Sequence, residues 1–310
     1  LIIHMLESSI ELRPNQIAAM DEMRKAFPDM PETLVRTVIS AERFGCAAEM
    51  AITAAFYKCE SSPYGTPANH TQTKMADECR QAFFGRLGSE NSDFTSLYAL
   101  WKVWDRKRTS PQDQWFEGYT VGSLLLEDNA LERVDKIRSE LLVLLAKNGI
   151  NTTPSSESPR YVCERIKEVA TRELLRSGHL VYKKNTNEKD YYETGQDGKK
   201  LLVGFASATS TNDAMFLVVD SVRKDRILSS VDRPSYIAQM VQVVTWEDLQ
   251  NFAPQFLRRN PYNFDVSPGL NPSSYRYLSR IPLYFQPIPD ASKELCINLT
   301  TLEENSGTNP

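Results

Sequence analysis

Residues 240–257, MVQVVTWEDLQNFAPQFL, combine a β-strand, a capped helical turn and a proline stop. From 241 to 245, valine and threonine alternate with Gln242 and Val244, a pattern that suits a half-buried strand. Thr245 stands three residues before Asp248, as in a capping box, where hydroxyl and carboxylate accept from backbone N–H groups at a helix start. Ala253-Pro254 ends the turn because proline has no N–H to donate. Alone, this is an ordinary strand-to-helix junction. This junction is decisive for the fold because of its position. It closes a strand-rich segment, and that segment follows a long helical one.

The composition is that of a globular protein with room for two domains. The chain has 310 residues, of which 41% are hydrophobic and 25% charged, with a net charge of −4. Residues 160–260 carry 16 Lys and Arg against 13 Asp and Glu, whereas the rest carries 20 against 27. A mildly basic module inside an acidic chain permits binding to a polyanion but does not demand it.

The cysteines and the apolar runs indicate an intracellular protein, nuclear or cytoplasmic. Five scattered cysteines form no Cys-x-x-Cys pair, so we expect reduced thiols and no zinc site. No apolar run approaches 18 residues, and residues 1–5 do not read as a signal peptide, so we expect no membrane contact. The absence of Met at position 1 suggests a fragment of a longer polypeptide.

Residues 1–150 have the patterns of helices. Pro31 suits the first turn of a helix that Gly45 stops, and 46–57 continues as a helix too apolar for a surface position. Residues 61–73 are expected to form a loop. Aromatic residues between Phe94 and Trp104 form a stripe typical of a core. The clearest helix spans 129–147, with Asn129 as its cap.

The predicted domain boundary is the polar segment 151–160, NTTPSSESPR. A helix over 161–176 follows it, and then come short strand-like runs at 179–183, 191–193, 200–205, 215–220 and 236–244. Five short strands led by a helix favour a small barrel of the OB type. Residues 259–310 are rich in Pro and Asn, and we expect a loosely packed, partly disordered extension.

The usual enzyme signatures are missing. The chain has no phosphate-binding Gly-x-x-x-x-Gly-Lys loop, no His-Glu-x-x-His run and no Gly-x-Ser-x-Gly elbow. We therefore expect no catalytic residues and no metal or cofactor in this chain.

Basic clusters are the candidate binding residues. An OB-type barrel binds single-stranded nucleic acid by pairing a basic groove with exposed aromatic faces. The alternative is a solvated surface with tyrosines on a half-buried sheet. The candidates are Lys183, Lys184, Lys199, Lys200, Arg223, Lys224 and Tyr192 in the strand-rich segment, and Arg106, Lys107 and Arg108 in the helical one.

The order of these parts resembles the C-terminal region of DEAH-box ATP-dependent RNA helicases. The matching segments, in order, are residues 44–55 (FGCAAEMAITAA), 93–97 with Trp101 and Trp104, Trp115-Phe116, 137–141 (IRSEL), and 244–249 with Ala253-Pro254. The sequence departs from the family where Ala99 stands for a ratchet-helix Asn and Leu124 for an Arg. Losing that Arg removes a planar donor suited to phosphate.

The resemblance implies an α+β multidomain fold. It comprises a degenerate winged-helix remnant (1–30), a ratchet-like helical bundle (31–150), a linker (151–160), an OB-fold (161–258) and the extension (259–310). In the family, RecA-like domains bind ATP and Mg²⁺, while this region grips single-stranded RNA and receives activator proteins. Here those RecA-like domains would lie outside the chain. The alternative is a motor-less protein–protein interaction module that keeps the fold and has lost RNA binding.

Overall fold

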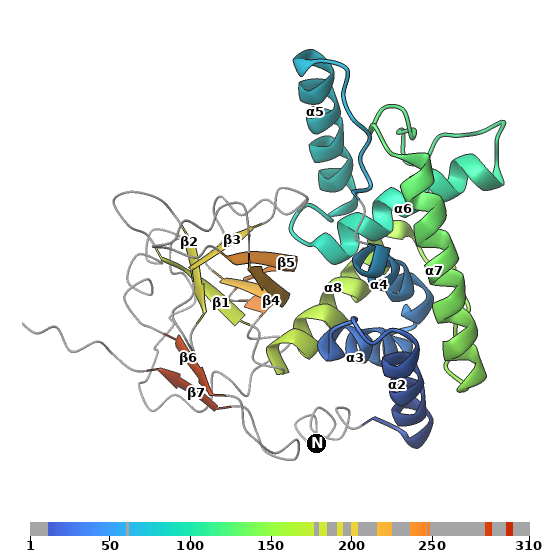
Figure 1. Ribbon diagram of the computed structural model, residues 1–310. Coiled ribbons are helices and arrows are strands. Elements are labelled where there is room, and N and C mark those ends of the chain that lie inside the picture. The colour runs from blue at the N-terminus through green and yellow to red at the C-terminus, as the bar shows by residue number, and fades with distance from the viewer. Residues whose placement is uncertain are drawn as a thin grey trace, which may run out of the picture. The chain divides into compact units, whose positions relative to one another are not determined.

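The computed structural model describes residues 12–59 and 62–176, and then the stretches 180–184, 191–194, 200–203, 216–224, 236–245, 247–248, 283–286 and 296–299 (Figure 1). The chain divides into two compact units, the first reaching Glu173 and the second beginning at Leu174. The first is helical and the second contains the strands, so the fold belongs to the α+β class, as predicted. The domain boundaries drawn from the sequence stay predictions.

The first half of the helical unit follows the sequence closely. It comprises α2 (Pro14–Ala26), α3 (Glu32–Ser40), the 3-10 turn η1 (Ala41–Phe44) and α4 (Ala47–Cys59). Gly45 ends η1 with φ 65°, a left-handed conformation that glycine adopts without strain, as the predicted stop requires. Every residue from 47 to 56 is buried, which confirms that α4 is a core helix.

The second half comprises α5 (His70–Leu87), α6 (Asp93–Thr109), α7 (Asp128–Lys147) and α8 (Pro159–Arg176). Two predicted boundaries were wrong. The expected loop over 61–73 ends early, because the side chain of Asn69 accepts a hydrogen bond from Gln72 N and starts α5. The N-cap of α7 is Glu127, so Asn129 already lies inside the helix.

The core of this unit lies around α4, which packs against α3, α6 and α7 (Figure 1). The aromatic stripe of α6 contributes to it as predicted: Phe94, Tyr98, Trp101 and Trp104 are all buried. An ion pair joins α8 to α3, with Arg36 Nε 2.8 Å from Glu173 Oε2. Thus α8, whose last three residues belong to the second unit, is held to the helical unit by a specific contact.

The strands follow the predicted positions. They are β1 (Leu180–Lys184), β2 (Tyr191–Thr194), β3 (Lys200–Val203), β4 (Phe216–Lys224) and β5 (Tyr236–Val244). Their pairing order is β1-β2-β3-β5-β4, and β4 pairs back with β1, so these five strands form a closed ring of pairs. The β3–β5 pair is parallel and the other pairs are antiparallel.

The capping box predicted after β5 is confirmed. Thr245 N donates to Asp248 Oδ2 at 2.9 Å, and Asp248 N donates to Thr245 Oγ1 at 3.0 Å. The half-buried alternation predicted for this strand was wrong, because residues 240–244 are all buried, including Gln242. The strand has neighbours on both edges, β3 and β4, and it is buried on both faces. Trp246 and Pro254 lie outside the described residues.

The predicted C-terminal extension contains more regular structure than expected. Within it, β6 (Leu283–Gln286) and β7 (Cys296–Leu299) form an antiparallel pair. Each of these strands has only four residues, so a prediction based on composition did not detect them. In the part of the chain that the structure describes, no helix combines the length and apolar character needed to cross a membrane.

Candidate nucleic-acid interface

The basic cluster predicted from the sequence in the helical unit lies in the last turn of α6. This position suits basic residues, because cations interact favourably with the negative end of the helix dipole. The three residues are Arg106, Lys107 and Arg108. Each of the three also faces a carboxylate. The acidic partners are Asp113 for Arg106, Asp128 for Lys107, and Asp105 and Asp135 for Arg108. The cluster is therefore neutralised within the unit.

Packing reinforces that arrangement. The guanidinium carbon of Arg108 lies 5.4 Å from the centroid of the Trp104 ring, a cation–π distance. The Arg106 guanidinium holds the pKa of Asp113 below its ordinary value, chiefly through their hydrogen bond. Because these side chains already have partners, a phosphate would have to compete with carboxylates for them.

The two positions at which the sequence departs from the DEAH-box pattern are core positions. Ala99 in α6 and Leu124 in the α6–α7 connection both have no exposed surface. The backbone of Leu124 is hydrogen-bonded: its carbonyl oxygen accepts from Arg80 Nε at 3.0 Å, and its N–H donates to the carbonyl oxygen of Thr120 at 3.2 Å. Neither side chain can therefore reach a polynucleotide.

In the second unit, the structure describes the backbone register of the predicted binding positions. Lys183 pairs with Tyr192 across β1 and β2, and Lys184 pairs with Tyr191. Lys200 pairs with Glu193 across β2 and β3. The β4 positions Arg223 and Lys224 pair with Ile237 and Tyr236 of β5, and Lys199 lies outside the described residues. Thus basic and tyrosine positions that are separate in sequence become neighbours along β1 and β2.

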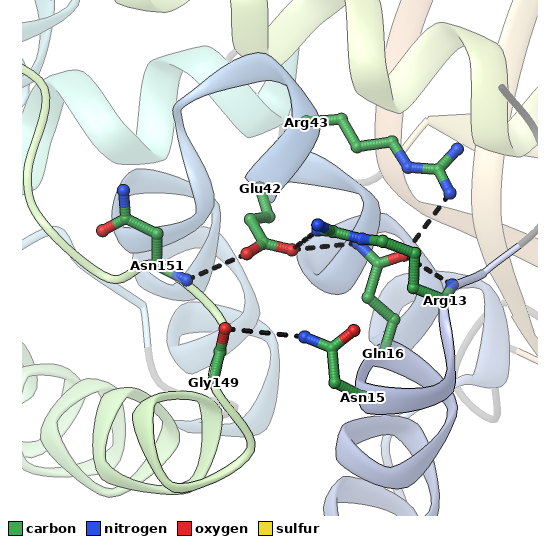
Figure 2. A network of polar contacts seen from close by, with 7 residues as sticks. All are labelled: Arg13, Asn15, Gln16, Glu42, Arg43, Gly149 and Asn151. Atoms are coloured by element: carbon green, nitrogen blue, oxygen red, sulfur yellow. Dashed lines mark hydrogen bonds and ion pairs between the residues drawn. The ribbon is translucent and has the colours of Figure 1, made fainter.

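The sequence did not reveal a polar network centred on Glu42 (Figure 2). Glu42 Oε2 accepts from Arg13 Nη2 and from Gln16 Nε2, the latter at 3.0 Å, while Glu42 Oε1 accepts from the backbone N–H of Asn151 at 3.1 Å. The Gln16 side chain is fully buried, and its Oε1 accepts from Arg13 N at 3.0 Å and from Arg43 Nη2 at 3.5 Å. One carboxylate thus joins three segments of the chain.

Only part of this network could be predicted from residues that are close together in the sequence. Pro14 at a helix start with Gln16 two residues later indicates where α2 begins. The partners of Glu42 lie 26 to 109 residues away, and no periodicity encodes those distances.

A second buried carboxylate, Glu49, lies on α4. Its Oε1 accepts from the backbone N–H of Ser155 at 2.8 Å, and its Oε2 has no hydrogen-bond partner. Burial raises the pKa of Glu49 above its ordinary value, although the Ser155 hydrogen bond and the charges of Lys102 and Arg138 oppose that shift. This residue lies in the segment 44–55, on which the resemblance to the helicase family partly rests. In the structure, its side chain binds the backbone N–H of Ser155.

Among the residues whose side chains the structure describes, neither the cysteines nor a metal-binding cluster offers a further site. Cys46, Cys59, Cys79 and Cys163 are free, and burial raises the pKa of Cys46 and of Cys163 to about 12, so neither of these two thiols is reactive at neutral pH. Among the described residues, no group of three His, Cys, Asp or Glu side chains could hold a metal ion.

Comparison with known proteins leaves the family open. No family model matches the sequence, and no curated protein matches it.

Proposed function

We propose that this chain is the accessory region of a DEAH-box-like RNA helicase, in which the strand-rich unit contacts single-stranded RNA and the helical unit is its scaffold. The observation that carries this proposal is the closed strand order β1-β2-β3-β5-β4 with a parallel β3–β5 pair, following a helical bundle. A five-stranded barrel of the OB type has the size and Greek-key character of this arrangement, and such barrels bind oligonucleotides.

The register supports placing the RNA on β1 and β2. Single-stranded nucleic acid is bound by basic residues along its backbone and by aromatic residues on which bases stack. Lys183 and Lys184 occupy positions paired with Tyr192 and Tyr191. By contrast, the basic residues at the end of α6 have carboxylate partners, so the helical unit contributes little to phosphate binding in this proposal.

In this function, ATP and Mg²⁺ belong to RecA-like domains outside the chain, and activator proteins dock on the strand-rich unit. The contribution of the chain is to hold the RNA strand while the motor domains step.

The test is a titration of the purified chain with a labelled single-stranded RNA at several salt concentrations. A protein that binds phosphates weakens as salt rises, with a logarithmic slope near −0.7 for each phosphate contact on a single strand. We expect binding with that dependence. Absence of binding at about 50 mM salt, where electrostatic binding is strong, would contradict the proposal.

A second candidate is a motor-less protein-interaction module, and one surface residue favours it. Trp115 in the α6–α7 connection is 61% exposed, whereas its neighbour Phe116 lies against Phe83 with ring centroids 6.4 Å apart. Tryptophan is enriched in the energetic centres of protein interfaces. Two results together would support this second function. The chain would not bind RNA, and Trp115→Ala would abolish its binding to a protein partner.

A further inference from the structure

The backbone of the connection between α7 and α8 is hydrogen-bonded to side chains of the helical unit at Gly149, Asn151 and Ser155. It leaves α7 through Gly149, whose φ of 70° ends the helix, and it reaches α8 at Pro159. We call residues 151–158 the strap. The strap contains no helix or strand, and the backbone N–H groups of Asn151 and Ser155 donate to Glu42 and Glu49 respectively. The backbone of the strap is therefore held by two carboxylates of the unit beneath it.

The first fastening is shared with α2. Glu42 gives one oxygen to Asn151 N and the other to Arg13 Nη2 and Gln16 Nε2, so the orientation of its carboxylate depends on all three donors (Figure 2). The Glu42 side chain is only 10% exposed. Asn15 adds a further link, donating through Nδ2 to the carbonyl oxygen of Gly149 at 3.5 Å. The start of α2 is thus joined directly to Gly149, just before the strap, and through Glu42 to Asn151 at the start of the strap.

The second fastening is independent of α2. Glu49 lies on α4, and the charged groups acting on it are Lys102 of α6 and Arg138 of α7. Tyr98 of α6 and Cys46, just before α4, also lie near it, and the α8 groups that act on Cys46 are Arg165 and Glu168. None of these groups belongs to α2. The Ser155 hydrogen bond thus involves no residue of α2.

We propose that Glu42 is a relay that couples the first turn of α2 to the strap, so that removal of the Arg13 side chain loosens the strap at Asn151 and leaves it fastened at Ser155. The physical reason is that a carboxylate side chain loses rotamer freedom when it is bound, and charge-assisted donors on one oxygen hold the other oxygen in place. Without the Arg13 donor, Glu42 samples other orientations and the Asn151 hydrogen bond forms less often. The strap leads into α8, whose end belongs to the second unit, so the relay reaches the helix that connects the two units.

Backbone amide hydrogen exchange on the whole chain tests the relay, because exchange reports local opening residue by residue. The variant is Arg13→Ala. The matched control is Arg24→Ala, which removes an exposed arginine inside α2 that pairs with Asp21 and Glu32. We expect Arg13→Ala to speed exchange at Asn151 by roughly three- to tenfold, as for the removal of one hydrogen bond of ordinary strength, and to change Ser155 less than about twofold. We expect Arg24→Ala to change neither amide.

Glu42→Gln extends the test without removing the side chain. The amide keeps an oxygen for Asn151 but lacks the charge that attracts Arg13, so exchange at Asn151 should rise as in Arg13→Ala. The relay is contradicted if Asn151 exchanges at the wild-type rate in Arg13→Ala. It is also contradicted if Asn151 and Ser155 accelerate equally, which indicates general loosening, or if Arg24→Ala has the same effect as Arg13→Ala. These results do not depend on RNA binding, so the relay and the proposed function fail separately.

Discussion

The end of α6 and the turn at Glu42 are two places where charged side chains gather, and they are built differently. At the end of α6, the side chains of Arg106, Lys107 and Arg108 remain between 37% and 50% exposed, and each pairs with a carboxylate. At Glu42, the carboxylate is nearly buried and binds donors from α2 and from the strap. Exposed ion pairs contribute little because water screens them, whereas a buried acceptor with several donors is costly to remove. The presence of a charged group therefore indicates neither stability nor binding. The number of chain segments that bind to the same charged group is more informative.

The largest expected effect is that of Glu42→Ala. Removing the carboxylate leaves the buried Gln16 amide and the Asn151 N–H without their acceptor, so we expect a loss of about 2 to 3 kcal/mol in the free energy of unfolding. Urea unfolding followed by circular dichroism measures it. Glu140→Ala, an exposed glutamate on α7, is the control and should change stability by less than about 0.5 kcal/mol. If Glu42→Ala and Glu140→Ala lowered the stability equally, the contrast between a buried carboxylate with several donors and an exposed one would be wrong.

A capping carboxylate in the second unit gives an intermediate case. Asp248 is buried and accepts from Thr245 N, three residues before it. We expect Asp248→Ala to cost about 1 kcal/mol, the usual value for removal of a helix cap. Glu247→Ala changes the exposed neighbour and should have a negligible effect. A loss as large as that of Glu42→Ala would show that local and long-range carboxylates are equivalent here.

The pH dependence of Glu49 sharpens the account of buried charge. Because burial raises its pKa above the ordinary 4.5, the folded protein binds the proton more tightly than the unfolded chain does. The stability that this proton contributes is fully present below pH 4.5 and is lost as the pH rises through the folded pKa. The difference in unfolding free energy between wild type and Glu49→Gln should therefore change with pH in that window, to the disadvantage of the wild type at higher pH. A difference that is constant with pH would contradict the raised pKa.

The smallest expected effect is at the end of α6. Lys107→Ala removes an ion pair whose side chains are 37% and 46% exposed, so we expect a change of at most about 0.5 kcal/mol. Thermal unfolding at low and high salt measures it, and the small effect should shrink further as salt rises. A loss above about 1 kcal/mol would place this cluster in the same class as Glu42.

Much of the fold was predictable because its signals are local. The stop at Gly45, the apolar α4 and the capping box at Thr245 and Asp248 each depend on residues within a few positions of one another. The cap of α7 was wrong by two positions, because asparagine is the residue type favoured at a cap although the helix already begins at Asp128. The burial of Gln242 depends on both strand neighbours, and the Glu42 network depends on residues up to 109 positions apart. Those features require the tertiary structure.

The candidate site was predictable in part for the same reason. Counting charges identified Arg106, Lys107 and Arg108, but it could not reveal that Asp128 and Asp135 of α7 lie beside them. The tyrosine-rich and lysine-rich runs of β1 and β2 were found from the sequence, whereas their antiparallel register comes from the structure.

RNA binding by two double variants tests the central claim most directly. Lys183→Ala with Lys184→Ala alters the strand-rich unit, and Arg106→Ala with Lys107→Ala removes the same number of positive charges from the helical unit. In a titration with labelled single-stranded RNA, we predict that the first pair weakens binding and lowers the magnitude of the salt slope by about 0.7 for each phosphate that the protein no longer binds. We predict that the second pair leaves both quantities unchanged. Equal weakening by the two pairs, or a larger effect of the α6 pair, would contradict the assignment of RNA binding to the strand-rich unit.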